Sequence, residues 1–353
     1  MAEAIKIGIV GAGAVGGVIS AMLAEKGYDV ELARRHQSQI NLGNCVGLEV
    51  IGEFGNRMIL VPSVPGTDAF TSKKDIIFIL TRAQDAPECL KKSGQFLKQK
   101  GVFVCVQNVM NIDEISQIVP IEKVVGLVID WMAVRHNMGK MEVLKKGGMQ
   151  IGMYNKLDNP LLDTVQQMLS EISPTAVTNN LLGTVYSRTI MSACVSSMSA
   201  MSGLTIGGVL KQPPSKKIME RIVEEAVDVA QKLNLQIEPF DSVLDYYKFV
   251  KKGLSGKIYR NKMIRRIIKN NEYVTPSDLA AIEKKKKTEV DYLNGYVVKV
   301  ARRIDSIAPV NERTCFIVKE IEEGKRTCNT ENLEDYYLNH PNKYIYQKAK
   351  GEI

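Results

Sequence analysis

Three glycines near the start of the chain, Gly11, Gly13 and Gly16, have a spacing that can hold a phosphate. They follow the apolar run 5–10 and precede the helical pattern of 15–26, which predicts a strand, a turn and a helix. Gly11 would permit the tight turn, Gly13 would let a pyrophosphate approach the backbone, and Gly16 would let helix and strand pack closely. The helix N-terminus would present free N–H groups and a positive dipole end to the phosphates. The residues assigned to this dinucleotide site are Gly11, Ala12, Gly13, Ala14, Val15 and Gly16. The alternative is a glycine turn that binds nothing.

The next strand, 29–33, indicates which dinucleotide is bound. NAD enzymes place an acidic residue near the end of this strand, on the ribose 2′-hydroxyl. Here Glu31 lies mid-strand and the strand ends in Arg34 and Arg35, whose guanidinium groups suit a 2′-phosphate. We therefore expect NADP(H) rather than NAD(H). Arg82, just after a later apolar strand, is assigned to the same cofactor, with a solvated surface arginine as the alternative.

Periodicity predicts an α/β Rossmann domain, with a doubly wound and mostly parallel sheet, followed by an all-α helical domain. Near-continuous apolar runs at 75–81, 101–106 and 123–129 are typical of parallel strands that are covered on both faces. The further predicted elements of this domain are helices at 86–98 and 112–118 and an irregular hairpin portion near 136–153. Beyond residue 180 the predicted elements are helices at 185–202, 215–233, 241–252, 261–270 and 288–304.

The expected domains are 1–180 for the cofactor, 181–326 for substrate and dimerisation, and 327–353 as a peripheral C-terminal extension. Because no Pro/Gly linker separates the first two, we expect them to pack tightly with a cleft between them.

The order of motifs resembles the ketopantoate reductase family over roughly residues 5–325, as a divergent member. The matching pieces are the glycine fingerprint, Arg35, Gln107-Asn108, the small-residue helix ending Ser199-Ala-Met-Ser-Gly203, and Thr288-Glu-Val-Asp-Tyr-Leu-Asn294-Gly295. The resemblance implies an NADPH-dependent reductase with a Rossmann domain, a helical domain and an active site between them.

The resemblance also implies roles for individual residues. Asn108 matches an asparagine beside the nicotinamide, Ser277 a serine that binds the substrate carboxylate, and Glu289 an active-site glutamate. Ala133 is assigned to the cofactor-binding set.

The chain departs from the family pattern at other site positions. The family's catalytic lysine falls on Arg188, and its substrate-binding asparagines fall on Ser192 and Ser196. A further asparagine position falls on Ile206, and a lysine position falls on Arg82.

These departures change the expected chemistry. Reduction of a keto group needs a hydride, a positive group near the oxygen and a proton. Arginine keeps the charge but, with a pKa above about 12, is a poor proton donor, so the proton would come from water or another group. Arg188, Ser192 and Ser196 are spaced by four and would share one helix face. The alternatives are that the two serines only pack, and that Glu289 caps a helix or pairs with a lysine.

We predict an NADP(H)-dependent oxidoreductase acting on a small anionic 2-oxo acid, with Arg188 and Glu289 catalytic and Ser192, Ser196 and Ser277 binding substrate. Two alternatives stay open. The first is an authentic 2-dehydropantoate 2-reductase of pantothenate biosynthesis with arginine in place of lysine. The second is a non-catalytic NADP-binding sensor or partner protein.

The distribution of charge along the chain indicates which classes of partner to expect. The net charge is +8, and since residues 1–180 hold 18 basic and 18 acidic side chains, the excess lies in the second half. A basic stretch, 247–287, has 13 basic and three acidic side chains. We interpret it as raising the electrostatic potential for an anionic substrate and cofactor rather than binding nucleic acid.

Six scattered cysteines and three histidines predict no metal site. We also expect no membrane contact, a cytoplasmic location and a homodimer.

Overall fold

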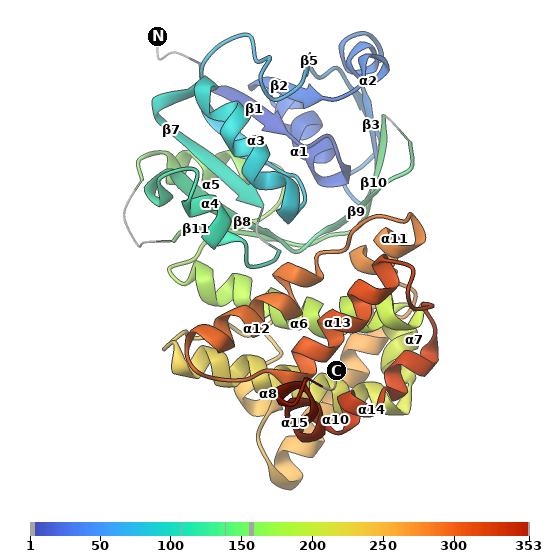
Figure 1. Cartoon of the computed structure of the whole chain (residues 1–353). Coiled ribbons are helices and arrows are strands. Elements are labelled where there is room, and N and C mark those ends of the chain that lie inside the picture. The colour runs from blue at the N-terminus through green and yellow to red at the C-terminus, as the bar shows by residue number, and fades with distance from the viewer. Residues whose placement is uncertain (1–3, 107, 138, 155–158, 352–353) are drawn as a thin grey trace. The chain divides into compact units, whose positions relative to one another are not determined.

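The computed structural model describes residues 4–106, 108–137, 139–154 and 159–351, which form two compact units, 1–181 and 182–353. The first unit is a mostly parallel sheet with helices, and the second is helical (Figure 1). The predicted fold class is therefore confirmed. Gln107, which belongs to one motif of the family resemblance, lies outside the described residues.

The main sheet of the first unit has the strand order β12-β11-β8-β7-β6-β1-β2-β5. All neighbouring strands pair in parallel except β8 and β11, which are antiparallel. The strands are β1 (Lys6–Val10), β2 (Asp29–Arg34), β5 (Ser63–Pro65), β6 (Lys74–Ile79), β7 (Leu97–Val106), β8 (Val124–Ile129), β11 (Met149–Met153) and β12 (Thr175–Val177).

Helices cover both faces of this sheet, as its continuous apolar strands require. One face packs on α1 (Ala14–Glu25) and α5 (Leu161–Ser170), through a core that includes Val18 and Leu169. The other face packs on α3 (Ala86–Ser93) and α4 (Ile112–Ser116), through Leu90 and Ile115.

A second, four-stranded sheet lies in the same unit, in the order β4-β3-β10-β9. Its strands are β4 (Arg57–Ile59), β3 (Leu48–Gly52), β10 (Lys140–Lys145) and β9 (Met132–Arg135), and α2 (Gln37–Asn41) precedes it in the chain. In the region of the predicted irregular hairpin, near 136–153, β9 and β10 pair antiparallel, and β10 also pairs with β3. β11 does not join them, because it pairs with β8 of the main sheet.

The second unit contains ten α-helices among its described residues. They are α6 (Leu181–Ser202), α7 (Ile206–Lys211), α8 (Pro213–Lys232), α9 (Tyr246–Phe249), α10 (Gly253–Asn270), α11 (Ser277–Glu283), α12 (Asn294–Arg303), α13 (Pro309–Glu322), α14 (Tyr336–Asn339) and α15 (Pro341–Ala349).

Two of the predicted helices in this unit differ from the structure. Most of 241–252 is not helical, because Asp241 and Ser242 adopt left-handed backbone angles, with φ of 49° and 55°. The predicted helix 288–304 is broken, because a 3-10 turn at Val290–Tyr292 precedes α12.

A chain of buried polar side chains ties four helices of the second unit together. Ser197 of α6 donates to Asn294 of α12 at 2.6 Å, and Asn294 donates to Asn311 of α13 at 3.0 Å. The Asn311 amide in turn donates to the Glu225 carboxylate of α8 at 2.8 Å. Glu225 also accepts from the backbone N–H groups of Val310 and Asn311 at the start of α13. The network satisfies polar groups that would otherwise be costly to bury.

The C-terminal segment 327–353 belongs to the second compact unit. Leu338 is fully buried, and Asp335 forms a largely buried, two-bond ion pair with Arg313 of α13. The Arg221 side chain donates to the Leu338 carbonyl. These contacts join the segment to α8 and α13.

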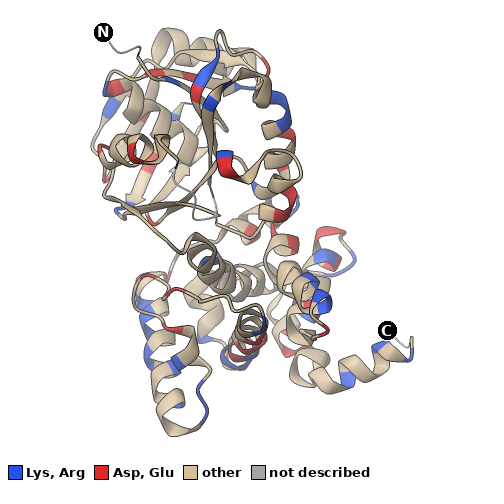
Figure 2. Cartoon of the chain, turned by 90° about the vertical axis from the view of Figure 1, so that its left-hand side faces the viewer, with Lys and Arg blue, Asp and Glu red and all other residues tan. Residues whose placement is uncertain are grey.

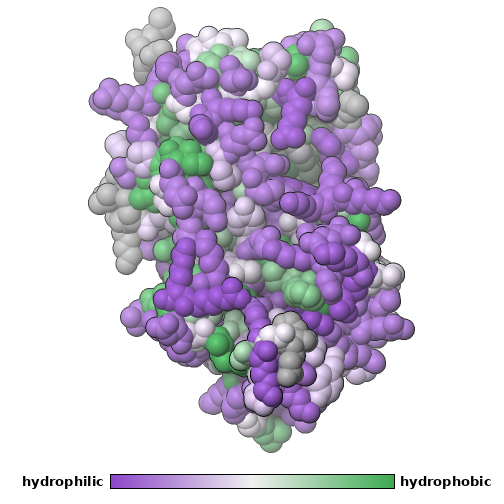
Figure 3. All heavy atoms as spheres, viewed as in Figure 1, coloured by the Kyte–Doolittle hydropathy of each residue, from purple (hydrophilic) through white to green (hydrophobic). Residues whose placement is uncertain are grey.

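The surface is largely polar. Lys and Arg residues lie on several helices of the second unit, including the helix that ends the chain (Figure 2). The face in Figure 3 is mainly hydrophilic, with apolar residues in separate small patches. Across the described ranges, no helix combines the length and apolar character that a membrane crossing needs.

Candidate functional site

The three glycines between β1 and α1 have three different environments. Gly11 has φ of 111°, and a Cβ there would lie 2.5 Å from the Leu80 carbonyl oxygen. A Cβ on Gly16 would collide with the Gly11 carbonyl. A Cβ on Gly13 would meet nothing within 4 Å. Gly11 and Gly16 are therefore needed by the turn itself, whereas Gly13 borders open space that a ligand could use.

The N-terminus of α1 beside Gly13 suits an anion. The Gly13 carbonyl accepts from Gly17, so the first-turn N–H groups have no intrahelical acceptor. Gly13 provides no side-chain cap, and the first turn holds no acidic residue that would compete for the dipole. Residues 14 to 16 can therefore direct backbone N–H groups at a phosphate, as the sequence predicts.

Glu31 is occupied inside the fold and is not placed to bind a ribose. It accepts from the Thr71 N–H at 3.0 Å and from the Thr71 hydroxyl, and its carboxylate pairs with Lys74 at 2.9 Å. Burial raises the pKa of Glu31, but the bonds from Thr71 and Lys74 outweigh it and leave the pKa below its usual value. An acid on the 2′-hydroxyl, typical of NAD enzymes, is therefore not provided by this strand.

The two arginines at the end of β2 differ in exposure. Arg34, its last residue, is 3% exposed and donates to the Gln39 carbonyl at 2.6 Å. Arg35 is exposed, and its charge acts on Glu88 and Cys89 of α3. Arg135 of β9, which sequence reasoning missed, donates to the Ala12 carbonyl of the glycine turn at 3.0 Å.

The other predicted cofactor residues follow neighbouring strands. The glycine turn, Arg82 and Asn108 come after β1, β6 and β7, which are adjacent and parallel, so all three lie toward the carboxyl edge of the sheet. Ligands of open α/β sheets bind at this edge. Arg82 is half-buried, and Asn108 is exposed. Ala133 is half-buried in β9, opposite Val143 of β10.

In the second unit, α6 carries the predicted Arg188, Ser192 and Ser196 on one face, as their spacing of four requires. Arg188 lies against the loop after α8. Its guanidinium carbon is 5.8 Å from the centre of the Phe240 ring. Burial lowers the pKa of Arg188, and the nearby Asp241 and Tyr246 oppose this. Arg188 is thus a half-buried cation, packed on an aromatic face.

The loop that faces Arg188 is held in a sharp bend. Phe240 and Leu244 exchange two backbone hydrogen bonds of 2.9 Å around the left-handed Asp241 and Ser242. The buried Tyr246 donates to the Ser187 carbonyl at 2.6 Å, which ties the loop to α6. Sequence reasoning missed Asp241 because it predicted a helix there.

The remaining predicted residues of the second unit meet around Asp278 at the start of α11. The Asp278 N–H donates to the Ser196 hydroxyl at 3.3 Å, and its carboxylate accepts from the Glu289 N–H at 2.9 Å. Asp278 is 1% exposed, and the adjacent Ser277 is exposed. The structure therefore brings Ser196, Ser277 and Glu289 together. Ser192 is half-buried on α6, and Ile206, the position of a family asparagine, is buried at the start of α7.

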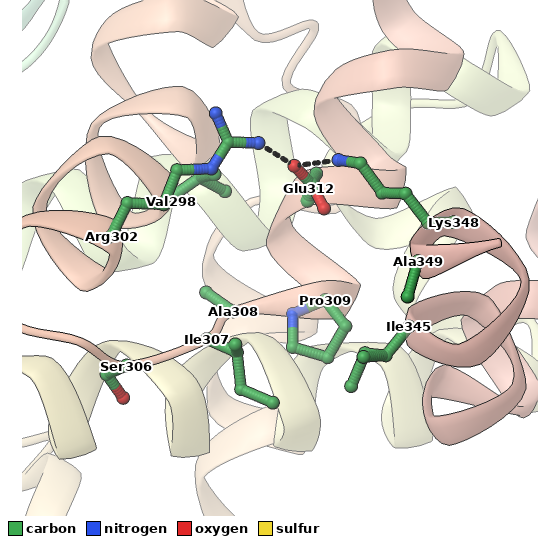
Figure 4. A pocket seen from close by; sticks show the side chains of 10 residues that line it. All are labelled: Val298, Arg302, Ser306, Ile307, Ala308, Pro309, Glu312, Ile345, Lys348 and Ala349. Atoms are coloured by element: carbon green, nitrogen blue, oxygen red, sulfur yellow. Dashed lines mark hydrogen bonds and ion pairs between the residues drawn. The ribbon is translucent and has the colours of Figure 1, made fainter. Parts of the chain in front are cut away.

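A separate pocket of about 410 Å³ lies in the second unit, between the ends of α12, α13 and α15 (Figure 4). It has an apolar side that includes Ile307 and Ile345, and the Glu312 carboxylate accepts from both Arg302 and Lys348. It contains no residue predicted from the sequence to bind substrate. Among the described residues, no three His, Cys, Asp or Glu side chains are grouped as a metal site would need.

Comparisons with known proteins show the family of the chain. Residues 7–156 match the family model Ketopantoate reductase PanE/ApbA, and residues 180–322 match Ketopantoate reductase PanE/ApbA C terminal. A 2-dehydropantoate 2-reductase of Pyrococcus horikoshii is 23% identical over 320 residues, which cover 90% of this chain and 97% of that protein.

Solved structures match at similar coverage. D-mandelate dehydrogenase with NADH and anilino(oxo)acetate has a TM-score of 0.77 at 19% identity, covering 91% of this chain and 99% of that one. A PanE/ApbA family ketopantoate reductase from Ralstonia eutropha has a TM-score of 0.75 at 19% identity, covering 92% and 100%. At this identity the structural likeness bears on the fold.

Proposed function

Because the chain belongs to the ketopantoate reductase family of nicotinamide-dependent oxidoreductases, we propose that it reduces the keto group of a small 2-oxo acid with NADPH. The observation that carries this proposal is the glycine turn. A Cβ on Gly13 would meet no atom within 4 Å, and the helix N-terminus that follows has no side-chain cap. The next strand, β2, ends at Arg34, and Arg35 comes directly after it. These groups favour a cofactor with a 2′-phosphate.

The bound nicotinamide would supply the hydride, and the chain's own residues would do the rest. Burial lowers the pKa of Arg188, but the pKa of an arginine is so high to begin with that the side chain keeps its positive charge. In this proposal the guanidinium stabilises the developing charge on the substrate oxygen or holds the substrate carboxylate. Phe240 and the bend at Asp241 hold it in place.

Ser277, Ser196 and Glu289 would form the polar end of the substrate site. The exposed Ser277 hydroxyl can donate to a carboxylate. Ser196 accepts from Asp278 and still has its own proton to donate. Glu289 is fixed through its backbone N–H, so its side chain would organise the substrate and the source of the proton. An arginine in place of lysine leaves the proton to water or to another group.

Two alternatives follow from the same residues. The first keeps 2-dehydropantoate itself as substrate, with Arg188 working at reduced efficiency. The second is a protein that binds NADP(H) without turnover, because arginine is a poor proton donor.

NADPH oxidation, measured with a panel of 2-oxo acids that includes 2-dehydropantoate, separates these functions. We expect turnover with at least one acid other than 2-dehydropantoate. Rapid turnover of 2-dehydropantoate alone would support the first alternative, and tight NADPH binding with no turnover would support the second. Arg188→Lys should raise activity on 2-dehydropantoate, and an unchanged rate would contradict the assigned position.

The proposal also covers assembly and location. The apolar side chains of Leu254 and Ile258 on α10 are 74% and 60% exposed, which supports a homodimer. The six free thiols support work in a reducing cytoplasm. Light scattering coupled to size exclusion should give twice the mass of one chain, and a single-chain mass would contradict the dimer.

A further inference from the structure

Arg34 is a buried cation without a charged partner. It is 3% exposed, and its described contact is one bond from Nη1 to the Gln39 carbonyl. Its Nε is buried without a hydrogen-bond partner, and no carboxylate of the described chain forms an ion pair with it. A charge that is removed from water and left unpaired is costly. An anion bound beside Arg34 would offset this cost.

A second arginine, Arg135 of β9, acts electrostatically on the first. Arg135 donates to the Ala12 carbonyl, so it lies against the glycine turn, although 123 residues separate the two in sequence. Burial lowers the pKa of Arg34, and the neighbouring charge of Arg135 lowers it further. Two like charges repel, and an anion bound between them would offset that repulsion.

The nearby carboxylates are engaged elsewhere. Glu31 of β2 pairs with Lys74 at 2.9 Å. On the second sheet, Glu142 bonds to His136 at 2.6 Å, and Glu49 pairs with Lys140 at 2.9 Å. Lys74 and Lys140 are thus paired with carboxylates, whereas no carboxylate of the described residues forms an ion pair with Arg34 or Arg135.

We propose that Arg135 is a third arginine of the cofactor site and, with Arg34 and Arg35, binds the 2′-phosphate that distinguishes NADPH from NADH. The inference rests on the proposed function. The turn's backbone N–H groups would face the pyrophosphate, whereas Arg34 and Arg35 come at the end of β2, where the ribose 2′-position is bound. Arg135 ends β9, and its side chain contacts the glycine turn at Ala12. A phosphate monoester carries close to two negative charges, which suits a group of guanidiniums.

A purely structural role for Arg135 makes a different prediction. If it only braced the turn through Ala12, its loss would weaken every ligand of the turn equally. If it binds the 2′-phosphate, its loss weakens 2′,5′-ADP and NADPH but leaves 5′-AMP and NADH nearly unchanged.

The test is calorimetric binding of these four ligands to the apoprotein and to Arg135→Ala, with Lys140→Ala as a matched cation control on the adjacent strand. We expect at least about a tenfold loss for the two 2′-phosphorylated ligands alone, since hydrogen bonds to charged groups are strong, and no change in the control. Equal losses for NADPH and NADH would overturn the inference. If the wild-type protein itself binds NADH as tightly as NADPH, the proposed cofactor fails instead, and the two failures are thereby distinguished.

Arg34→Met gives a second readout that needs no cofactor. Methionine fills the same buried space without an unpaired charge. The melting temperature of the apoprotein should rise or stay equal, while the stabilisation by 2′,5′-ADP is lost. A variant that melts lower and keeps its full response to 2′,5′-ADP would show that Arg34 is structural, and would overturn the inference.

Discussion

The two units treat their positive charge in opposite ways. Residues 1–180 have no net charge, yet they bury Arg34 without an ion-pair partner among the described residues. The second unit carries the whole excess, but the four lysines 284–287 are exposed and its buried Arg313 is paired with Asp335. Net charge and anion recognition are therefore separate properties. An anion is recognised where desolvated donors are left unsatisfied, and not simply where basic residues are numerous.

The same contrast applies to how each unit positions its functional groups. In the first unit, backbone geometry forms the site, through the turn at Gly11 and the open position at Gly13. In the second unit, side chains on separate helices are joined by hydrogen bonds around Asp278. Single substitutions should therefore separate binding of the cofactor from binding of the substrate.

The largest expected effect is at Arg188. Its replacement by alanine should lower kcat/KM about 100-fold or more, as loss of a group that stabilises developing oxygen charge commonly does. Binding of NADPH, measured by fluorescence, should stay unchanged, because Arg188 belongs to the other unit. The matched control is Arg302→Ala, which removes an arginine from the pocket of Figure 4. Equal losses of kcat/KM in the two variants would contradict a special role of Arg188 in turnover.

The buried network of the second unit should be visible in the pH dependence of stability. Burial raises the pKa of Glu225 from 4.5 to about 7, against the opposing bonds from Asn311 and Val310. Between these values the folded state holds more protons than the unfolded state, so the unfolding free energy should fall as pH rises. The fall is on the order of 3 kcal/mol.

Chemical denaturation across this pH range, compared with Glu225→Gln, tests the assignment. The glutamine variant should lack this component of the pH dependence. Glu224→Gln, at the adjacent carboxylate that pairs with Lys252, should keep it. If all three proteins showed the same dependence, Glu225 would not be the titrating group.

Two glycine substitutions, with smaller expected effects, should distinguish cofactor binding from folding in the glycine turn. Gly13→Ala adds a Cβ where no atom lies within 4 Å, so the melting temperature should hold while NADPH affinity falls, by roughly ten- to 100-fold. Gly16→Ala places its Cβ against the Gly11 carbonyl and should destabilise the fold itself. A Gly13→Ala protein that binds NADPH normally would mean that the open space is not the phosphate position.

The sequence predicts the central strands well, for a physical reason. β1, β2, β6, β7 and β8 are each buried on both faces, and this leaves continuous apolar runs that can be read locally. The segment 37–65 was not predicted. Its strands β3, β4 and β5 are three to five residues long, and β3 pairs with the distant β10. Pairing over such a distance leaves no local periodicity to detect.

The residues of the candidate site also divide into those that a local sequence motif predicts and those that it does not. The glycine turn and the arginines after β2 were predicted because a single local motif places them. Arg135 and Asp278 were not, since each acts through a contact with a residue far away in the chain, Ala12 or Ser196. The helix predicted over 241–252 failed because the left-handed angles of Asp241 and Ser242 are set by the bend that faces Arg188. A charged residue buried by tertiary contacts gives no signal in composition.

The ratio of NADH to NADPH dissociation constants for the unmodified protein tests the central claim most directly. Arg34 and Arg35 at the end of β2 and Arg135 of β9 predict a ratio of about 100 or more, since each charge-assisted contact to the 2′-phosphate contributes. Glu31, which would favour NADH, is already occupied by Thr71 and Lys74. A ratio near one would contradict the account, because the unpaired Arg34 would then have no phosphate to bind.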